Sequence, residues 1–285
     1  MTFRASGTQE PGRSMDFMGE YVIAGGVNTY YEVYGDGEPL VLLHGGGANA
    51  LSWLAQIPEL AKHFRVYVPE RRGHGHTADV DGPISFQIMA EDTAAFLETL
   101  EIGPAHLVGW SDGGIVAVLV AMRRPDLVRK LVAIGVYVNR DGETPACHQL
   151  FEEPVSARMG EIVRGSYTEA PDGPDHFPVI YEKLLRMWRE EPNIAICDLA
   201  AIQAPTLLMQ GDDDGVTVEH SLAMARAIPD SQLAVVPGAS HGVPMEKPEL
   251  VNRMILDFLA GNQPRKVFAL RDSLPEYLRD PAASA

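Results

Sequence analysis

The chain is poor in cysteine and in basic residues, and it has no long apolar run. Two of its 285 residues are cysteine, Cys147 and Cys197, which are too few for a disulfide framework and lack metal-ligand spacing. Its 23 Lys and Arg are outnumbered by 39 Asp and Glu, and the formal net charge of -16 repels nucleic acid and anionic membranes. The longest apolar run, 115–122, is too short to span a bilayer. These absences predict a cytoplasmic protein without a nucleic-acid or membrane partner.

The two ends of the chain lack a periodic apolar pattern. Residues 1–18 and 263–285 are polar, so we expect flexible tails there, with a short helix near 274–278. The first 20 residues also contain no apolar stretch followed by a cleavage signal, as a secretory leader would.

Between the tails, apolar runs of strand length alternate with helical patterns. The alternation fills 19–138 and 202–262 and predicts an α/β fold, a doubly wound, mostly parallel sheet with helices on both faces. Two β-rich runs around Gly25-Gly26 predict an antiparallel hairpin at one edge. The segment 139–201 breaks the alternation with frequent Pro and Gly and two short helical patterns, so we expect a helical insertion. The other expected strands are 40–43, 66–68, 105–108, 131–134, 206–209 and 233–236, and the expected core helices are 53–63, 86–100, 115–122, 218–227 and 249–260.

A candidate nucleophile lies between an expected strand and an expected helix. Gly109-Trp110-Ser111-Asp112-Gly113 has the form G-x-S-x-G, in which a strained turn exposes the serine hydroxyl above the sheet. Glycines are required because side chains would collide in so tight a bend. The motif alone is weak, and its position between strand and helix is what predicts that Ser111 is the nucleophile.

A nucleophilic serine needs a base, and the base needs an orienting carboxylate. The strand 206–209 runs into three aspartates, 212–214, and the strand 233–236 runs into a loop that contains His241. The order serine, aspartate, histidine is the one expected of this fold. His241 is therefore the predicted general base, with the acid among the three aspartates.

The glycine run after the first core strand has two interpretations. His44-Gly45-Gly46-Gly47 can supply a backbone N–H to an oxyanion, opposite the N–H of Asp112. The same glycines also fit G-x-G-x-x-A, and Glu70 follows at the distance of a ribose-binding acid, which would indicate a nicotinamide-dependent oxidoreductase. That alternative leaves the serine turn unexplained.

Five motifs in order resemble the α/β-hydrolase superfamily: HGGG at 44–47, RRGHGHT at 71–77, GWSDGG at 109–114, GDDDGV at 211–216 and GASHG at 238–242. The resemblance covers about residues 20–261 and implies the α/β-hydrolase fold, a helical cap at 139–201 and no cofactor. It also implies that Asp214, the last aspartate of G-D-x-D, is the catalytic acid, and that Gly46 supplies one oxyanion amide.

The motif GWSDGG is similar to that of valacyclovir hydrolase-like esterases, in which the acid beside the nucleophile helps to accept an aminoacyl substrate. Asp112 has that position here. The alternative is that Asp112 stabilises the start of its helix, where the helix dipole favours an acid. We expect Gly45, Gly47, Trp110 and Trp188 to contact the substrate.

The sequence therefore predicts a serine hydrolase that cleaves a small ester, thioester or lactone through an acyl-enzyme. An ester is favoured over an amide because an alkoxide leaving group needs less acid assistance. Carbon-carbon hydrolysis, amide hydrolysis and perhydrolysis by the same residues stay open, as does a receptor of the same fold without catalysis. The expected partner is a small-molecule ester, and homodimer formation is left open.

Overall fold

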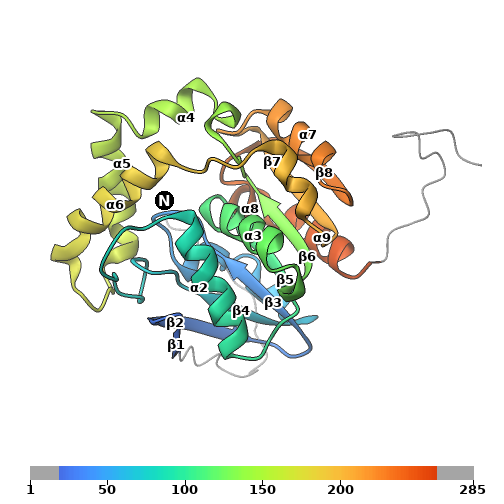
Figure 1. The fold of residues 1–285 in the computed structure, drawn as a ribbon, viewed down its shortest axis with the longest axis horizontal. Helices are drawn as coiled ribbons and strands as arrows, with labels where there is room; N and C mark the ends of the chain where they lie inside the picture. The colour runs from blue at the N-terminus through green and yellow to red at the C-terminus, as the bar shows by residue number, and fades with distance from the viewer. Residues whose placement is uncertain (1–18, 262–285) are drawn as a thin grey trace, which may run out of the picture.

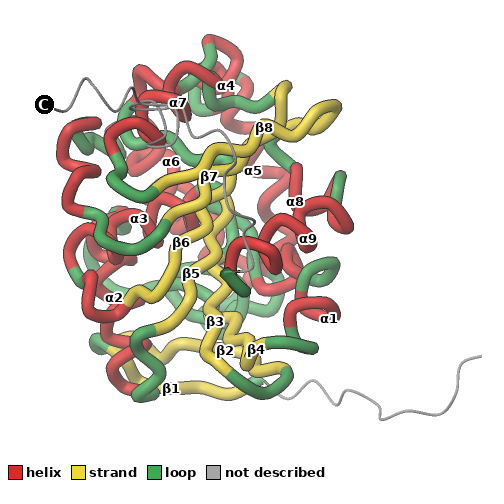
Figure 2. Tube along the Cα trace, turned by 90° about the vertical axis from the view of Figure 1, so that its right-hand side faces the viewer, coloured by secondary structure: helices red, strands yellow, loops and turns green. Residues whose placement is uncertain are grey.

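The computed structural model describes residues 19–261, so the tails and the short helix expected at 274–278 lie outside the described residues. An eight-stranded sheet forms the centre of the fold, in the order β1-β2-β4-β3-β5-β6-β7-β8 (Figures 1 and 2). β2 is antiparallel to both of its neighbours, and β3 to β8 are parallel to one another. The strands are β1 (Glu20–Ala24), β2 (Val27–Tyr34), β3 (Glu38–Leu43), β4 (Phe64–Pro69), β5 (Ala105–Trp110), β6 (Val128–Ile134), β7 (Thr206–Asp213) and β8 (Ser231–Ser240).

The predicted hairpin at the sheet edge is confirmed. β1 pairs with β2 in antiparallel register, and the turn between them consists of Gly25 and Gly26. Both glycines have positive φ, 57° and 83°, which this tight turn requires and which side chains with a Cβ disfavour.

Helices cover both faces of the sheet, as the alternation predicts. In β3, Leu40 and Leu42 pack into one buried cluster, whereas Val41 and Leu43 pack into the other. Figure 2 shows α2 and α3 on one side of the strands and α1 and α9 on the other. The strand is apolar at every position because each of its two faces is buried.

The helices of the described residues vary from single turns to fourteen residues. The α-helices are α1 (Ile57–Leu60), α2 (Phe86–Thr99), α3 (Asp112–Arg123), α4 (Pro145–Leu150), α5 (Val155–Val163), α6 (Phe177–Glu190), α7 (Val218–Ala227), α8 (Val243–Glu246) and α9 (Pro248–Leu259). The 3-10 turns are η1 (Ala50–Trp53), η2 (Pro125–Leu127), η3 (Arg140–Gly142), η4 (Arg164–Tyr167), η5 (Pro174–His176) and η6 (Ile196–Ala201). Within 19–261, none of these helices combines the length and the apolar character needed to cross a membrane.

One expected helix, at 53–63, is wrong. The structure instead has η1, which ends at Trp53, and the four-residue α1, in which Pro58 lies in the first turn. Proline has no N–H to donate to the carbonyl of residue 54, so a helix cannot run through this position and has to begin there.

The segment 139–201, which we call the cap segment, leaves the sheet after β6 and contains α4, α5 and α6. Figure 1 shows these three helices grouped at one end of the molecule, away from β1 and β2. α6 buries one face: Phe177, Ile180, Leu184, Met187 and Trp188. α4 was not predicted, because its six residues carry no buried apolar side chain and therefore no periodic signal.

Candidate active site

Ser111 lies on a strained turn between β5 and α3. Its φ of 55° and ψ of -125° fall outside the regions that L-residues ordinarily adopt. The turn is held by the Ser111 N–H, which donates to the carbonyl of Ile134 at 2.8 Å. Strain of this kind persists only where the surroundings fix the backbone, and it clusters at functional sites.

The glycines of the turn are required by close backbone approach. A Cβ on Gly109 would lie 2.2 Å from the carbonyl oxygen of Gly113, and a Cβ on Gly113 would lie 2.1 Å from that of Leu43. A side chain at Gly109 would therefore force the two ends of the turn apart, and one at Gly113 would push the turn away from the end of β3. The serine turn and the glycine run after β3 are packed as one unit.

His241 links Ser111 to Asp214. Its Nε2 lies 2.9 Å from Ser111 Oγ, and its Nδ1 lies 2.7 Å from Asp214 Oδ1. The Asp214 side chain is buried, whereas Asp212 and Asp213 are exposed. With Nδ1–H donating to the carboxylate, Nε2 is left as the acceptor for the serine proton. This arrangement can activate a hydroxyl for attack on a carbonyl carbon.

The surroundings of His241 favour its protonated form. Burial disfavours the positive charge of the imidazolium. The hydrogen bond and the negative charge of Asp214 favour it, and together with the charges of Asp112 and Glu246 they outweigh the effect of burial. The net result is that the pKa of His241 lies above its ordinary value of 6.5. The imidazolium that forms when the serine is deprotonated is therefore stabilised.

Trp110, an expected substrate contact, also supports the histidine loop. Its Nε1 donates to the carbonyl of His241 at 2.8 Å, and the two rings are 5.7 Å apart. The indole also covers Gly45, where an added Cβ would lie 2.9 Å from two ring carbons. Trp110 thus contacts both the histidine loop and the glycine run.

The structure brings together Gly46 and Asp112, the two residues whose amides are predicted to form an oxyanion hole. Asp112 is the first residue of α3, so its N–H has no acceptor within the helix. Gly46 lies in the loop after β3, and its N–H makes no hydrogen bond to another residue within 19–261. The two residues are close together, since a Cβ on Gly46 would lie 2.2 Å from Asp112 Oδ2.

Arg71 and His44 hold the glycine run from behind, and the sequence analysis gave neither residue a role. The buried Arg71 guanidinium donates to the carbonyls of His44 and Gly45. Burial lowers the pKa of Arg71 to about 10, although the charge of Asp112 opposes this, so the group stays charged at neutral pH. Arg71 is the second residue after β4, and this position at the carboxyl end of a parallel strand was the signal that could have identified it.

His44 is neutral and completes this support. Burial, with the charges of Arg71 and His74, holds its pKa well below the ordinary 6.5. As a neutral imidazole it donates from Nδ1 to the Gly45 carbonyl at 2.8 Å, while Nε2 accepts the backbone N–H of Arg71 at 3.2 Å. Both ring nitrogens therefore fix the loop in front of Ser111.

Asp112 and Trp188 make a contact that was not expected. Asp112 Oδ2 accepts a hydrogen bond from Trp188 Nε1 at 2.8 Å, and both side chains are buried. Trp188 belongs to α6, so this bond joins the cap segment to the nucleophile turn. Gly47, another expected substrate contact, is covered by the same segment, because a Cβ there would lie 2.9 Å from Val163.

The dinucleotide interpretation does not fit the geometry. Its expected ribose-binding acid, Glu70, is buried and accepts the backbone N–H groups of Ala50 and His76. The glycine run leads into η1, a 3-10 turn of four residues, and not into the α-helix whose N-terminus would hold a pyrophosphate. Within 19–261, no group of three or more His, Cys, Asp or Glu side chains is arranged to hold a metal ion.

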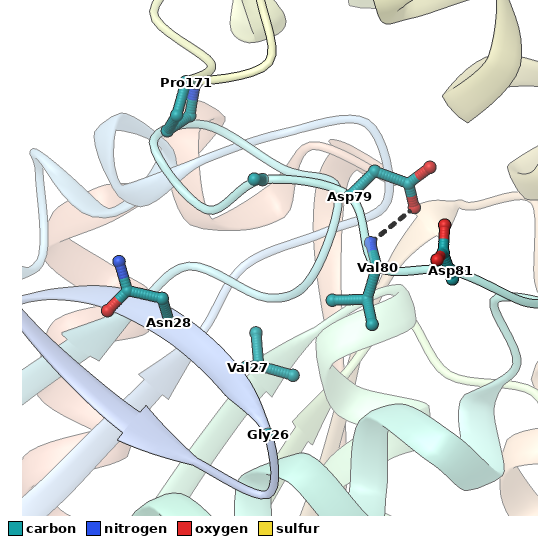
Figure 3. A pocket seen from close by; sticks show the side chains of 8 residues that line it. Gly26, Val27, Asn28, Asp79, Val80, Asp81 and Pro171 are labelled. Carbon is teal, nitrogen blue, oxygen red and sulfur yellow. Dashed lines mark hydrogen bonds between the residues drawn. The ribbon is translucent and has the colours of Figure 1, made fainter.

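A surface pocket of about 460 Å³ lies at a different place (Figure 3). It is lined by Gly26, Val27, Asn28, Ala78, Asp79, Val80, Asp81 and Pro171, none of which belongs to the predicted site. Asp79 is already paired, because Lys183 Nζ lies 2.7 Å and His176 Nε2 2.9 Å from its Oδ2. The pocket therefore borders an ionic contact between the cap segment and the loop that follows β4.

Comparison with known proteins identifies the family. The model of the alpha/beta hydrolase family matches residues 40–254. The putative carbamate hydrolase RutD of Azorhizobium caulinodans is 28% identical over 260 residues, covering 84% of this chain and 97% of that protein. The 2-hydroxy-6-oxo-2,4-heptadienoate hydrolase of Pseudomonas putida is 30% identical over 267 residues, covering 85% and 96%. A solved serine hydrolase involved in carbazole degradation has a TM-score of 0.74 at 27% identity, covering 86% and 99%.

The matched region contains most of β3, all of β4 to β8, and the three residues Ser111, Asp214 and His241, which are joined by hydrogen bonds. The fold and the family that five motifs predicted are confirmed. The chain belongs to the alpha/beta hydrolase family and is a hydrolase.

Proposed function

We propose that this chain is a serine hydrolase that cleaves a small carboxylic ester, thioester or lactone through an acyl-enzyme on Ser111. The observation that carries the proposal is the pair of short hydrogen bonds of His241, at 2.9 Å to Ser111 Oγ and 2.7 Å to Asp214 Oδ1. They join a strained serine, an imidazole and a buried carboxylate, the three groups that acyl transfer requires.

The mechanism follows from these contacts. His241 Nε2 takes the hydroxyl proton as Ser111 Oγ bonds to the carbonyl carbon, and Asp214 stabilises the imidazolium. The amides of Gly46 and Asp112 bind the oxyanion, and the leaving alkoxide departs with the proton from His241. Water then gives its proton to His241 and attacks the acyl carbon, which releases the acid and returns the proton to Ser111.

Carbon-carbon hydrolysis is the second candidate, and a relative supports it. The compound 2-hydroxy-6-oxo-2,4-heptadienoate contains no ester or amide bond, so the relative named for its hydrolysis breaks a carbon-carbon bond. The same serine can attack a ketone, and the same amides can bind the oxyanion that forms. A carbanion, however, is a much poorer leaving group than an alkoxide, so this reaction needs a placed proton donor. Our mechanism assigns His241 as the proton donor. Protonation by His241 is sufficient for an alkoxide leaving group, and we therefore favour the ester.

An aminoacyl ester remains a narrower version of the proposal, with Asp112 as the ammonium partner. Three features argue against it. The carboxylate is buried, it already accepts the bond from Trp188, and the positive charge of Arg71 acts on it. A substrate ammonium would have to displace the indole and approach a cation. We therefore favour neutral acyl groups.

The test is reaction with a fluorophosphonate probe and turnover of a substrate panel by the full chain. The panel contains p-nitrophenyl esters of increasing acyl length, matched aminoacyl esters, a lactone and a 6-oxo-dienoate. We expect labelling at Ser111, located by peptide mass spectrometry, and fastest turnover of a neutral ester or lactone. Ser111→Ala should abolish labelling and lower kcat by about four to six orders of magnitude, because the three residues act as a unit.

Each alternative predicts a different pattern in the same experiment. If the dienoate is turned over fastest, the proposed substrate is a carbon-carbon bond and not an ester. If aminoacyl esters are preferred and Asp112→Asn removes that preference, the substrate is an aminoacyl ester. Binding of esters without labelling or turnover would indicate a receptor and overturn the proposal.

A further inference from the structure

Three residues meet where the oxyanion would form. A Cβ added to Gly46 would lie 2.2 Å from Asp112 Oδ2 and 2.8 Å from Trp188 Cζ2. The Asp112 carboxylate and the Trp188 ring therefore both pack directly on Gly46. Gly46 and Asp112 are the residues whose amides our proposed mechanism assigns to the oxyanion, whereas Trp188 comes from the cap segment.

Other side chains of the cap segment pack against the Trp188 ring. It packs against Phe151, with ring centroids 5.4 Å apart, and edge-on against Tyr181 at 6.3 Å. Arg189, the next residue, donates from Nε to the Phe151 carbonyl at 2.8 Å. The direction of the indole N–H is thus fixed by the cap segment, and the carboxylate that accepts it is fixed in turn.

The bond also places an acceptor where a negative charge is difficult to hold. Burial raises the pKa of Asp112, against the lowering effects of the Arg71 charge and the Trp188 hydrogen bond. The negative charge of a carboxylate destabilises an oxyanion that forms beside it, unless hydrogen-bond donors to the carboxylate offset that charge. The indole N–H is such a donor, bonded to the oxygen that packs on Gly46.

We propose that Trp188 is a positioning residue for the oxyanion hole: through its bond to Asp112 and its contact with Gly46, the cap segment sets the two amides that receive the oxyanion. The inference rests on the proposed serine hydrolase function. It makes a cap residue part of the machinery for the transition state, where cap residues would otherwise be expected to select the substrate. Loss of the bond should therefore lower kcat and leave KM nearly unchanged.

The first experiment compares Trp188→Phe with Trp53→Phe. Phenylalanine at 188 keeps an aromatic ring and removes the N–H donor. Trp53 is the matched control, because it is fully buried and its Nε1 has no hydrogen-bond partner among the described residues. With p-nitrophenyl butyrate, we expect Trp188→Phe to lower kcat by roughly ten- to a hundredfold with KM changed less than about threefold. Trp53→Phe should change both constants little.

Binding of phenylboronic acid supplies a readout without turnover. Ser111 Oγ bonds to boron, its proton passes to His241, and the tetrahedral boronate places an oxygen at the oxyanion position. We expect Trp188→Phe to weaken this binding by about the same factor as kcat, since the boronate resembles the transition state. A purely structural tryptophan would lower the melting temperature and leave boronate affinity and kcat at the values of the control.

A second pair of variants keeps the test decisive should Trp188→Phe fail to fold. Asp112→Asn retains an oxygen that can accept the indole N–H, whereas Asp112→Ala removes it, and both keep the backbone amide. We expect Asp112→Ala to lose clearly more kcat than Asp112→Asn at a pH where His241 is neutral, and Trp188→Phe to add little in the Asp112→Ala background. Equal losses in the two Asp112 variants, or fully additive losses in the double variant, would overturn the inference. Failure of the proposed function looks different, because the unaltered protein would then show no turnover at all.

Discussion

The core side and the cap side of the candidate site are held by different forces. On the core side, the nucleophile turn is fixed by a backbone hydrogen bond and by contacts too close for any side chain, and side chains add bonds to the glycine run and the histidine loop. On the cap side, every hydrogen bond named above uses at least one side chain; two of these contacts are the bond from Trp188 to Asp112 and the ion pair of Lys183 with Asp79. Backbone contacts tolerate almost no change in sequence, whereas side-chain contacts can be exchanged one at a time.

The two cap contacts differ from each other as well. Trp188 and Asp112 are both buried and lie at the nucleophile turn, while the Asp79 cluster lies at the rim, beside the surface pocket of Figure 3. We infer that the inner contact serves the chemistry and the outer one holds the cap segment on the core. The predictions below test this division, from the core outward.

The largest expected effect in these comparisons belongs to the acid on the core side. Asp214→Asn should lower kcat by about three to four orders of magnitude, because an amide can stabilise the wrong tautomer of His241 and cannot stabilise the imidazolium. Asp213→Asn is the matched control, since this neighbouring carboxylate is exposed and should change kcat less than about twofold. Steady-state kinetics with one p-nitrophenyl ester measure both. If kcat falls more in an Asp212 or Asp213 variant than in Asp214→Asn, the catalytic acid is that residue and not Asp214.

The second effect is a shift in pH dependence. Because His241 accepts a proton only when neutral, kcat/KM should rise with pH through an apparent pKa above 6.5, the direction in which Asp214, Asp112 and Glu246 move it. Asp112→Asn removes one of these negative charges, so its curve should shift to lower pH. Glu246→Gln should shift the curve in the same direction. If kcat/KM is instead constant from pH 5 to 9 while chemistry limits the rate, histidine is not part of the mechanism.

The outer contact titrates in a different range, which separates it from the core. Partial burial favours the neutral form of Asp79, but the hydrogen bonds of Lys183 and His176 outweigh it, and the pKa of Asp79 lies below its ordinary 3.8. Its contribution to stability is therefore present above pH 3.8 and is lost as pH falls through the lower, folded-state pKa.

The smallest effect is expected at the rim. Lys183→Met keeps the aliphatic stem and leaves the Asp79 carboxylate without its ammonium partner, so the free energy of unfolding in urea should fall by about 1–3 kcal/mol. The kcat value should not change. Arg253→Met is the control, because its pair with Asp257 on α9 is exposed and should contribute less than about 1 kcal/mol. A loss of kcat in Lys183→Met as large as that in Trp188→Phe would end the division between inner and outer contacts.

The parts of the fold that follow from local sequence were predictable. The strand, turn and helix around Ser111 and the hairpin at Gly25-Gly26 each depend on residues within a short stretch, and the structure has both. The helix expected at 53–63 is wrong because the apolar periodicity of this stretch continues across Pro58, whereas the helix has to begin there. The domain boundaries of the cap segment stay a prediction, as does the cytoplasmic location.

Contacts between distant segments could not be read from the sequence. The role of Trp188 depends on how α6 lies over the nucleophile turn, and the bond to Asp112 spans 76 positions. The bond from the Trp110 N–H to the carbonyl of His241, 131 positions away, was likewise not expected. An indole has one donor, and which acceptor it finds is decided by packing and not by composition.

The hydrogen bond from Ser111 to His241 joins residues that are 130 positions apart. On the ribosome, the nucleophile turn is therefore complete long before the histidine loop has been translated. In that interval the serine has no base, so it is no more reactive than an ordinary hydroxyl. Under the proposed mechanism, the nascent chain cannot attack an ester during this interval. If the chain hydrolyses p-nitrophenyl esters as we propose, this activity should appear only when β8 and the histidine loop after it have joined the sheet, so its appearance times that event during synthesis.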